Sequence, residues 1–163
     1  MSSQPSRREF VATVAATAVL AGPAMHLLAD RGEVVPPPVT KSDTPNWIPT
    51  IKPSELKDGA QSDKFAKSNH LLLARDKDTI YALYNYCTHK GCAVGIKDNL
   101  LECPCHHARY GNTGAVTKAP AKMDLRRFAL RLNDKGIIEV DVSHVIDAAD
   151  KSSALKVDAT ATG

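Results

Sequence analysis

The sequence has little of what nucleotide-binding, hydrolytic or nucleic-acid-binding proteins require. No glycine-rich phosphate-binding loop, paired-carboxylate site or nucleophile triad is visible, and we expect no catalytic residue in the chain. The formal net charge of +3 is small and the basic residues are dispersed, so nucleic acid is not indicated as a partner. We interpret Arg126, Arg127 and Arg131 as a solvated face. Any function must therefore come from another group of residues.

Cysteine is also scarce, with only four in 163 residues, and all four fall in two short boxes. The boxes are Cys87-Thr88-His89-Lys90-Gly91-Cys92 and Cys103-Pro104-Cys105-His106. One cysteine and one histidine from each box, spaced C-x-H and C-x-x-H, make a Cys2His2 ligand set. Cys92 and Cys105 are left over, one in each box. The concentration of these residues in two boxes points to a metal centre.

Two kinds of metal centre use such ligands. Two thiolates and two imidazoles can hold a [2Fe-2S] cluster, with one pair of ligands on each iron. Zinc also accepts a Cys2His2 set, so a non-redox zinc-binding module is the alternative. C-x-H is a poor zinc knuckle, however, and a zinc ribbon leaves Cys92 and Cys105 without a role. We favour one [2Fe-2S] cluster per chain and single-electron transfer.

The boxes resemble those of the Rieske iron–sulfur protein family, in the disulfide-containing branch. That branch occurs in quinol–cytochrome complexes and in the small subunit of arsenite oxidase. The resemblance implies two thiolate ligands on one iron and two imidazole ligands on the outer, solvent-facing iron: Cys87, Cys103, His89 and His106. It also implies a disulfide between Cys92 and Cys105.

The resemblance extends over residues 47–142 and indicates further residues around the cluster. Tyr110 falls where the family has a tyrosine near a ligand cysteine, and Pro120 belongs to a segment that resembles the loop covering the cluster. Where the family usually continues Gly-Ser after the second ligand histidine, this chain has His107 and Ala108. Ala108 cannot donate the hydrogen bond of the family serine to a bridging sulfide, which implies a lower reduction potential. The role of His107 stays open between altering the charge at the cluster edge and simple solvent exposure.

Apolar alternation predicts the fold. Residues 71–74 and 79–84 flank a charged turn, and residues 125–132 and 137–140 flank Asn133-Asp134-Lys135-Gly136, so both pairs are expected to be hairpins. No helical periodicity of similar strength precedes the end of the chain. We predict an all-β fold, a Rieske-type antiparallel β sandwich with two cluster-binding loops. Residues 143–163, rich in alanine, serine, aspartate and lysine, are expected to be a frayed helix or a disordered end.

The first 30 residues have the features of a targeting segment. Arg7-Arg8 resembles the core of a twin-arginine export signal, and an uncharged, mostly apolar stretch follows from Phe10 to Ala29, apart from Pro23 and His26. Such a stretch is long enough to span a membrane, and we favour a retained anchor over cleavage. The implied location is the periplasmic face of the cytoplasmic membrane, where a disulfide persists. Residues 31–46 contain three consecutive prolines and are expected to form a stiff linker.

The sequence therefore predicts an electron-transfer subunit rather than a complete enzyme. The favoured parent is a quinol–cytochrome c or plastocyanin reductase, with cytochrome b or c subunits as redox partners and quinol as a further candidate. The alternative parent is a periplasmic molybdenum oxidase of the arsenite oxidase type, with its large subunit as partner.

Overall fold

The computed structural model describes residues 42–157. In this part of the chain nearly all regular structure is β, and every strand pairing is antiparallel. The predicted all-β class is confirmed. The strands form two sheets, a large one of seven strands and a small one of four.

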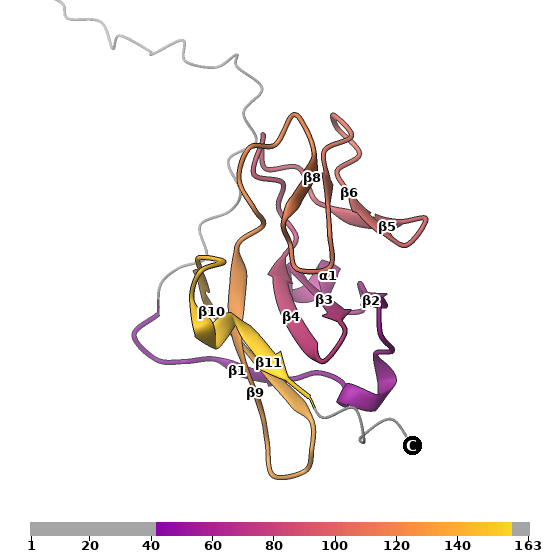
Figure 1. Ribbon diagram of the computed structural model, residues 1–163. Helices are drawn as coiled ribbons and strands as arrows, with labels where there is room; N and C mark the ends of the chain where they lie inside the picture. The colour runs from indigo at the N-terminus through magenta and orange to yellow at the C-terminus, as the bar shows by residue number, and fades with distance from the viewer. Residues whose placement is uncertain (1–41, 158–163) are drawn as a thin grey trace, which may run out of the picture. The chain divides into compact units, whose positions relative to one another are not determined.

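The large sheet combines strands from both ends of the described chain (Figure 1). Its main order is β1-β10-β9-β4-β3-β2, and β11 pairs with β4. Its strands are β1 (Trp47–Pro49), β2 (Gln61–Ser62), β3 (Leu71–Asp76), β4 (Thr79–Tyr84), β9 (Arg127–Leu132), β10 (Ile138–Ile146) and β11 (Ala154–Lys156). Both predicted hairpins are present, as β3–β4 and β9–β10.

The small sheet is an insertion between β4 and β9. Its order is β5-β6-β7-β8, so that each strand pairs with the next along the chain. The strands are β5 (Gly95–Lys97), β6 (Leu100–Glu102), β7 (Arg109–Tyr110) and β8 (Val116–Lys118). The first box lies between β4 and β5, and the second between β6 and β7. The four short strands were not predicted from the sequence, because two or three residues are too few for alternation to be visible.

The four consecutive apolar residues at the start of β3 follow from its position between two cores. Leu71 and Leu73 point into the core of the large sheet, whereas Leu72 and Ala74 point into the core beneath the boxes. All four are 0% exposed. Because successive side chains of a strand point to opposite faces, a strand covered on both faces is apolar throughout. β3 therefore packs against the core of the large sheet with one face and against the core beneath the boxes with the other.

Helices contribute little to the described part of the chain. The one α-helix, α1 (Ala66–Asn69), has four residues and leads into β3. The two short 3-10 helices are η1 (Pro53–Glu55) and η2 (Lys151–Ser153). Among residues 42–157, no helix is long and apolar enough to cross a membrane.

The expectation of a frayed helix or disordered end was wrong for residues 143–157. Strand β10 continues to Ile146, and β11 pairs with β4. β4 pairs with β9 only at Leu83, so its other half is left for β11 to pair with along Thr79–Tyr81. The polar composition of this segment gave no sign of a strand. Strand β11 is stabilised by pairing with the free edge of β4, which exists only in the folded protein.

The interpretation of Arg126, Arg127 and Arg131 as a solvated face is wrong for Arg127. Its side chain is 9% exposed and donates hydrogen bonds to the carbonyls of Ala148 and Thr113 and to the Ser153 hydroxyl. Its guanidinium also lies 4.6 Å from the centre of the Tyr81 ring. Burial lowers the pKa of Arg127, which is offset in part by Tyr81. Arg127 thus holds the segment before β11 against the sheet.

The predicted signal or anchor (1–30) and most of the predicted linker (31–46) lie outside the described residues. Those predictions stay untested.

Candidate metal centre

The first box forms a tight loop directly after β4. The amide of Cys87 donates to the carbonyl of Cys92 over 2.8 Å, and the amide of Gly91 donates to the carbonyl of Cys87 over 2.7 Å. Gly91 has φ of 72°, a left-handed conformation that glycine adopts without steric cost. The loop buries Cys87, which is 3% exposed, and leaves His89 half-buried.

The second box turns in a similar way between β6 and β7. The amide of His107 donates to the carbonyl of Cys103 over 2.9 Å, and the amide of Cys103 donates to the carbonyl of Ala108 over 2.9 Å. His107 has φ of 57°, so a non-glycine residue occupies a left-handed position here. This explains the glycine that the family usually has at this point. Cys103 is buried and His106 is exposed.

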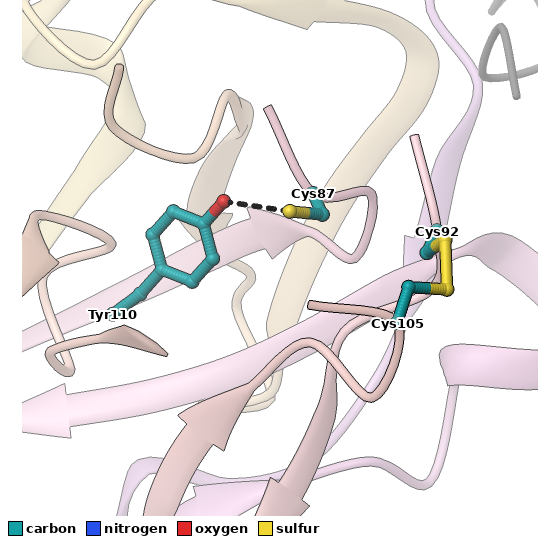
Figure 2. The surroundings of a disulfide bond; sticks show 4 residues. All are labelled: Cys87, Cys92, Cys105 and Tyr110. Atoms are coloured by element: carbon teal, nitrogen blue, oxygen red, sulfur yellow. Dashed lines mark hydrogen bonds between the residues drawn. A yellow bond between two sulfur atoms is a disulfide. The ribbon is translucent and has the colours of Figure 1, made fainter. Parts of the chain in front are cut away.

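A disulfide between Cys92 and Cys105 connects the two boxes (Figure 2). Their Cα atoms are 6.5 Å apart and the cysteines are separated by 13 positions in the sequence. The structure thus contains the disulfide that the resemblance implies. Because the bond joins one loop to the other, it limits how far the remaining cysteines and histidines of the boxes can move apart.

The four predicted ligands lie on the two boxes that the disulfide connects. Cys87 and Cys103 are the free cysteines of the chain, and both are buried. The rings of His89 and His106 meet edge to face with their centres 4.9 Å apart. Nδ1 of His89 is buried and has no hydrogen-bond partner among the described residues. A buried ring nitrogen without a partner is what a metal-binding imidazole requires, so the donor set fits an iron–sulfur centre.

Three sulfur atoms also lie close together. Those of Cys92, Cys103 and Cys105 are within 4.8 Å of one another. Two of them form the disulfide and offer no thiolate to a metal. Their proximity instead shows that the disulfide packs directly beside the Cys103 thiol.

Burial raises the pKa of the Cys103 thiol, and the adjacent Cys87 thiol raises it further. Hydrogen bonds from the backbone amides of Cys105 and His106 act in the opposite direction. Binding of iron must therefore displace a proton, which an adjacent cation favours strongly. The two amides would then donate to a thiolate sulfur, and such hydrogen bonds favour the reduced form of a cluster.

Tyr110 provides a further donor. Its hydroxyl donates to Sγ of Cys87 over 3.2 Å (Figure 2) and accepts a hydrogen bond from the Thr88 amide over 3.1 Å. Burial raises the pKa of Tyr110, followed by the effect of Cys87, so the hydroxyl stays protonated. Tyr110 thus contacts Cys87, one of the predicted ligands, and its role beside the cluster stays a prediction.

Ala108 and Pro120 are the other two residues that the resemblance indicates around the cluster. Ala108 is 0% exposed and packs in the same core as Cys87 and Cys103, but it has no hydroxyl to donate. Pro120 is half-buried in the loop after β8. That loop is attached to the first box, because the Thr88 hydroxyl donates to the carbonyl of Met123. Thr88 was not selected from the sequence, where a single threonine carries no distinguishing signal.

Glu102 is the second residue that sequence reasoning missed. It is 6% exposed and immediately precedes Cys103. Its two carboxylate oxygens contact Nδ1 of His107 at 3.0 Å, Nε of Arg109 at 2.6 Å and Nζ of Lys97 at 3.6 Å. The hydrogen bonds from His107 and then Arg109 lower the pKa of Glu102 to about 2. A carboxylate at the end of an apolar strand was the available signal.

Residues 46–129 match the family model of the Rieske [2Fe-2S] domain. The chain belongs to the Rieske family. A Rieske domain carries one [2Fe-2S] cluster, so the zinc-binding alternative no longer stands. The assignment of the four individual ligands stays a prediction from the boxes and their geometry.

The curated relatives include iron–sulfur subunits of the cytochrome b6-f complex. The cytochrome b6-f complex iron–sulfur subunit of Chlorobaculum thiosulfatiphilum is 29% identical over 104 residues, which cover 63% of this chain and 58% of that protein. The chloroplastic subunit of Triticum aestivum is 30% identical over 100 residues, which cover 58% of this chain and 43% of that protein. The match thus spans less than two thirds of the length of these relatives.

Solved structures of Rieske proteins are similar as well. The plasma membrane Rieske protein of Synechocystis is 26% identical, with a TM-score of 0.40 over 58% of this chain and 98% of that chain. A quaternary ammonium Rieske monooxygenase is 19% identical, with a TM-score of 0.50 over 66% of this chain and 33% of that chain. The latter likeness concerns the fold alone.

The chemistry of the centre follows from this assignment. A bound cluster accepts and releases one electron, at potentials of about −150 to +300 mV when two imidazoles replace two thiolates. The protein supplies buried thiols on the inner side, hydrogen-bond donors to sulfur and an exposed imidazole on the outer side. The chain is therefore a Rieske electron-transfer protein.

Proposed function

We propose that this Rieske protein is exported, is tethered to the periplasmic face of the cytoplasmic membrane, and carries electrons as a subunit of a quinol–cytochrome c or plastocyanin reductase. The observation that carries the proposal is the arrangement of the centre. Its cysteines are buried, whereas His106 is exposed at the end of the domain and His89 is half-buried next to it. An electron or a hydrogen-bonding substrate would reach the cluster through these imidazoles.

Two further observations support this parent complex. The relatives from Chlorobaculum thiosulfatiphilum and Triticum aestivum are subunits of the cytochrome b6-f complex. In addition, the paired arginines and apolar stretch at the N-terminus match an export signal that delivers folded, cofactor-loaded proteins. Both support a membrane-associated carrier outside the cytoplasm.

A relay subunit of an exported molybdenum oxidase of the arsenite oxidase type is the second candidate. The observation that favours it is Ala108, which is fully buried among the cysteines where the family usually has a serine hydroxyl. Loss of that donor lowers the potential of the centre, which suits a relay from a low-potential enzyme better than oxidation of a quinol.

The test compares membranes of the native host with and without this gene. We expect deletion to abolish quinol-dependent reduction of cytochrome c, and the intact gene but not His106→Ala to restore it. An affinity-tagged copy should co-purify with a cytochrome b subunit. Normal quinol oxidation after deletion, together with co-purification of a molybdenum-containing subunit, would overturn the proposal in favour of the second candidate.

A further inference from the structure

Two segments contain the predicted ligands and a third is bonded to them, and the charged residues of all three are basic. They are the first box (87–92), the second box with the residues after it (103–110), and residues 117–123, which run from the end of β8 into the following loop as far as the exposed Asp124. Together they contain four lysines and arginines and no aspartate or glutamate: Lys90, Arg109, Lys118 and Lys122. Arg109 is compensated, because it pairs with Glu102 at 2.6 Å. The three lysines form no ion pair in the described part of the chain.

These lysines belong to segments that are fixed to one another, and we call them the lysine collar (Lys90, Lys118 and Lys122). Lys118 lies at the end of β8, opposite Arg109 of β7. Lys122 lies between Ala121, buried in the core of the boxes, and Met123, whose carbonyl accepts from Thr88. Figure 1 shows the loop after β8 at the same end of the domain as both boxes. Lys118 and Lys122 are exposed and Lys90 is half-buried.

The same end of the domain also has two exposed side chains that are neither lysine nor arginine. His106 is exposed, and Met123 is 64% exposed, the largest value among the exposed large hydrophobic residues of the described chain. A small apolar and aromatic centre with charged residues around it is the usual anatomy of a protein–protein interface. A charged surface for solubility alone does not need an exposed methionine next to one of its lysines, as Met123 is next to Lys122.

We propose that the lysine collar docks an acidic surface patch of a redox partner protein, so that the exposed His106 faces the partner's redox centre. The inference rests on the proposed electron-transfer function and adds the chemistry of the partner to it. Unpaired surface charges of one sign steer an oppositely charged partner and raise its association rate about 10- to 1,000-fold at low salt. The effect is screened at physiological ionic strength beyond about 8 Å.

An anionic membrane surface is the other partner that three lysines fit. The position of the collar favours a protein, because the lysines lie on segments that contain the predicted ligands or are bonded to them. Docking of this end on lipid would keep the redox centre of a partner protein away from His106. The experiment below separates the two partners.

The test uses the purified, cluster-loaded protein and two small oxidants of opposite charge. Stopped-flow absorbance follows oxidation of the reduced cluster by ferricyanide, an anion, and by tris(phenanthroline)cobalt(III), a cation, over a range of ionic strength. We expect the rate with ferricyanide to fall as salt is added and the rate with the cobalt complex to rise. Binding of a hexaglutamate peptide, followed by NMR chemical shifts at low salt, gives a readout that does not depend on electron transfer.

Two triple variants remove equal charge from different ends of the domain. The collar variant replaces Lys90, Lys118 and Lys122 by glutamine. The control variant replaces Lys57, Lys77 and Lys135 by glutamine, all of them exposed and none within the three segments. At low salt we expect the collar variant to react about tenfold more slowly with ferricyanide and to lose peptide binding. The control variant should keep both properties.

The outcomes distinguish failure of the collar proposal from failure of the proposed electron-transfer function. If neither oxidant oxidises the reduced cluster, the proposed function itself fails. If both oxidise it, but salt and the collar variant change nothing and the peptide does not bind, the collar proposal alone is overturned. Binding to phosphatidylglycerol vesicles that requires the collar, without binding of hexaglutamate, would assign this end to a membrane and also overturn the proposal.

Discussion

Nδ1 of His107 donates to the buried carboxylate of Glu102 over a distance of 3.0 Å, and through this bond β6 supports the turn of the second box. His107 directly follows the predicted ligand His106 and has a left-handed backbone with φ of 57°. Histidine is one of the non-glycine residues that adopt this conformation more often than most, and the hydrogen bond stabilises it further. One of the two interpretations of His107, simple solvent exposure, is therefore incomplete.

Glu102 should make the stability of the fold depend on pH in a defined range. Hydrogen bonds from His107 and Arg109 lower the pKa of Glu102 from 4.5 to about 2. Because the folded-state pKa is the lower one, this stabilisation is complete above the unfolded value and is lost as pH falls through about 2. We expect the free energy of unfolding to decline less steeply over this range in Glu102→Gln, measured by chemical denaturation.

The matched control for Glu102 is Asp134→Asn, which removes an exposed carboxylate from the turn between β9 and β10. It should keep the wild-type dependence of stability on pH. An equally steep decline in Glu102→Gln and in the wild-type protein would contradict the assignment of this effect to Glu102.

Substitutions of His107 should separate backbone conformation from hydrogen bonding. His107→Gly loses the bond to Glu102 but relieves a left-handed conformation that costs other residues about 1–2 kcal/mol, so its stability should stay within about 1 kcal/mol of wild type. His107→Val loses the same bond and places a β-branched residue in that conformation, which should cost about 2 kcal/mol or more. Urea denaturation measures both; equal losses would show that the left-handed conformation is not required.

The predicted ligands should each be needed for the cluster. Replacing Cys87, Cys103, His89 or His106 by alanine is expected to abolish the two irons and two sulfides per chain and the rhombic EPR signal of the reduced protein. His70→Ala, which removes a histidine outside the boxes, is the control and should keep the full iron content. Stoichiometric zinc in the wild-type protein, without an EPR signal after reduction, would refute the ligand assignment.

Two substitutions should shift the reduction potential in opposite directions. Tyr110→Phe removes the donor to Sγ of Cys87 and should lower the midpoint by tens of millivolts. Ala108→Ser adds a hydroxyl to a fully buried position beside the cysteines and should raise it by a similar amount. Both follow because a hydrogen bond to cluster sulfur stabilises the more negative, reduced form. Protein-film voltammetry measures the shifts; an unchanged midpoint in Ala108→Ser would mean that the hydroxyl does not reach a sulfide.

The disulfide should stabilise the two boxes as a unit. Closing a loop of this length is worth about 3 kcal/mol in the chain-entropy description. Cys92→Ser with Cys105→Ser should therefore lower the unfolding free energy by up to that amount and release iron faster at elevated temperature. Alkylation and mass spectrometry of the exported wild-type protein should find both cysteines blocked. Free thiols at both positions in that protein would disprove the bond.

The sequence by itself determined the chemistry of the centre and the main hairpins. The predicted ligands can be recognised from residue type and spacing. Cysteine and histidine supply the sulfur and nitrogen donors that the cluster requires, and they occur together in C-x-H and C-x-x-H boxes. Strands such as β3, β4 and β9 are long enough for their apolar pattern to be visible. These features are local, so no knowledge of distant contacts is needed to recognise them.

Only the tertiary structure decided which residues support the centre and how the chain ends. Glu102, Thr88 and Met123 act through partners that lie 5 to 35 positions away in the sequence. Strand β11 exists because β9 leaves part of the β4 edge open, and Arg127 is buried because the segment before β11 folds over it. Hydrogen bonds of this kind depend on how the folded chain places two residues in space, and composition carries no information about that placement.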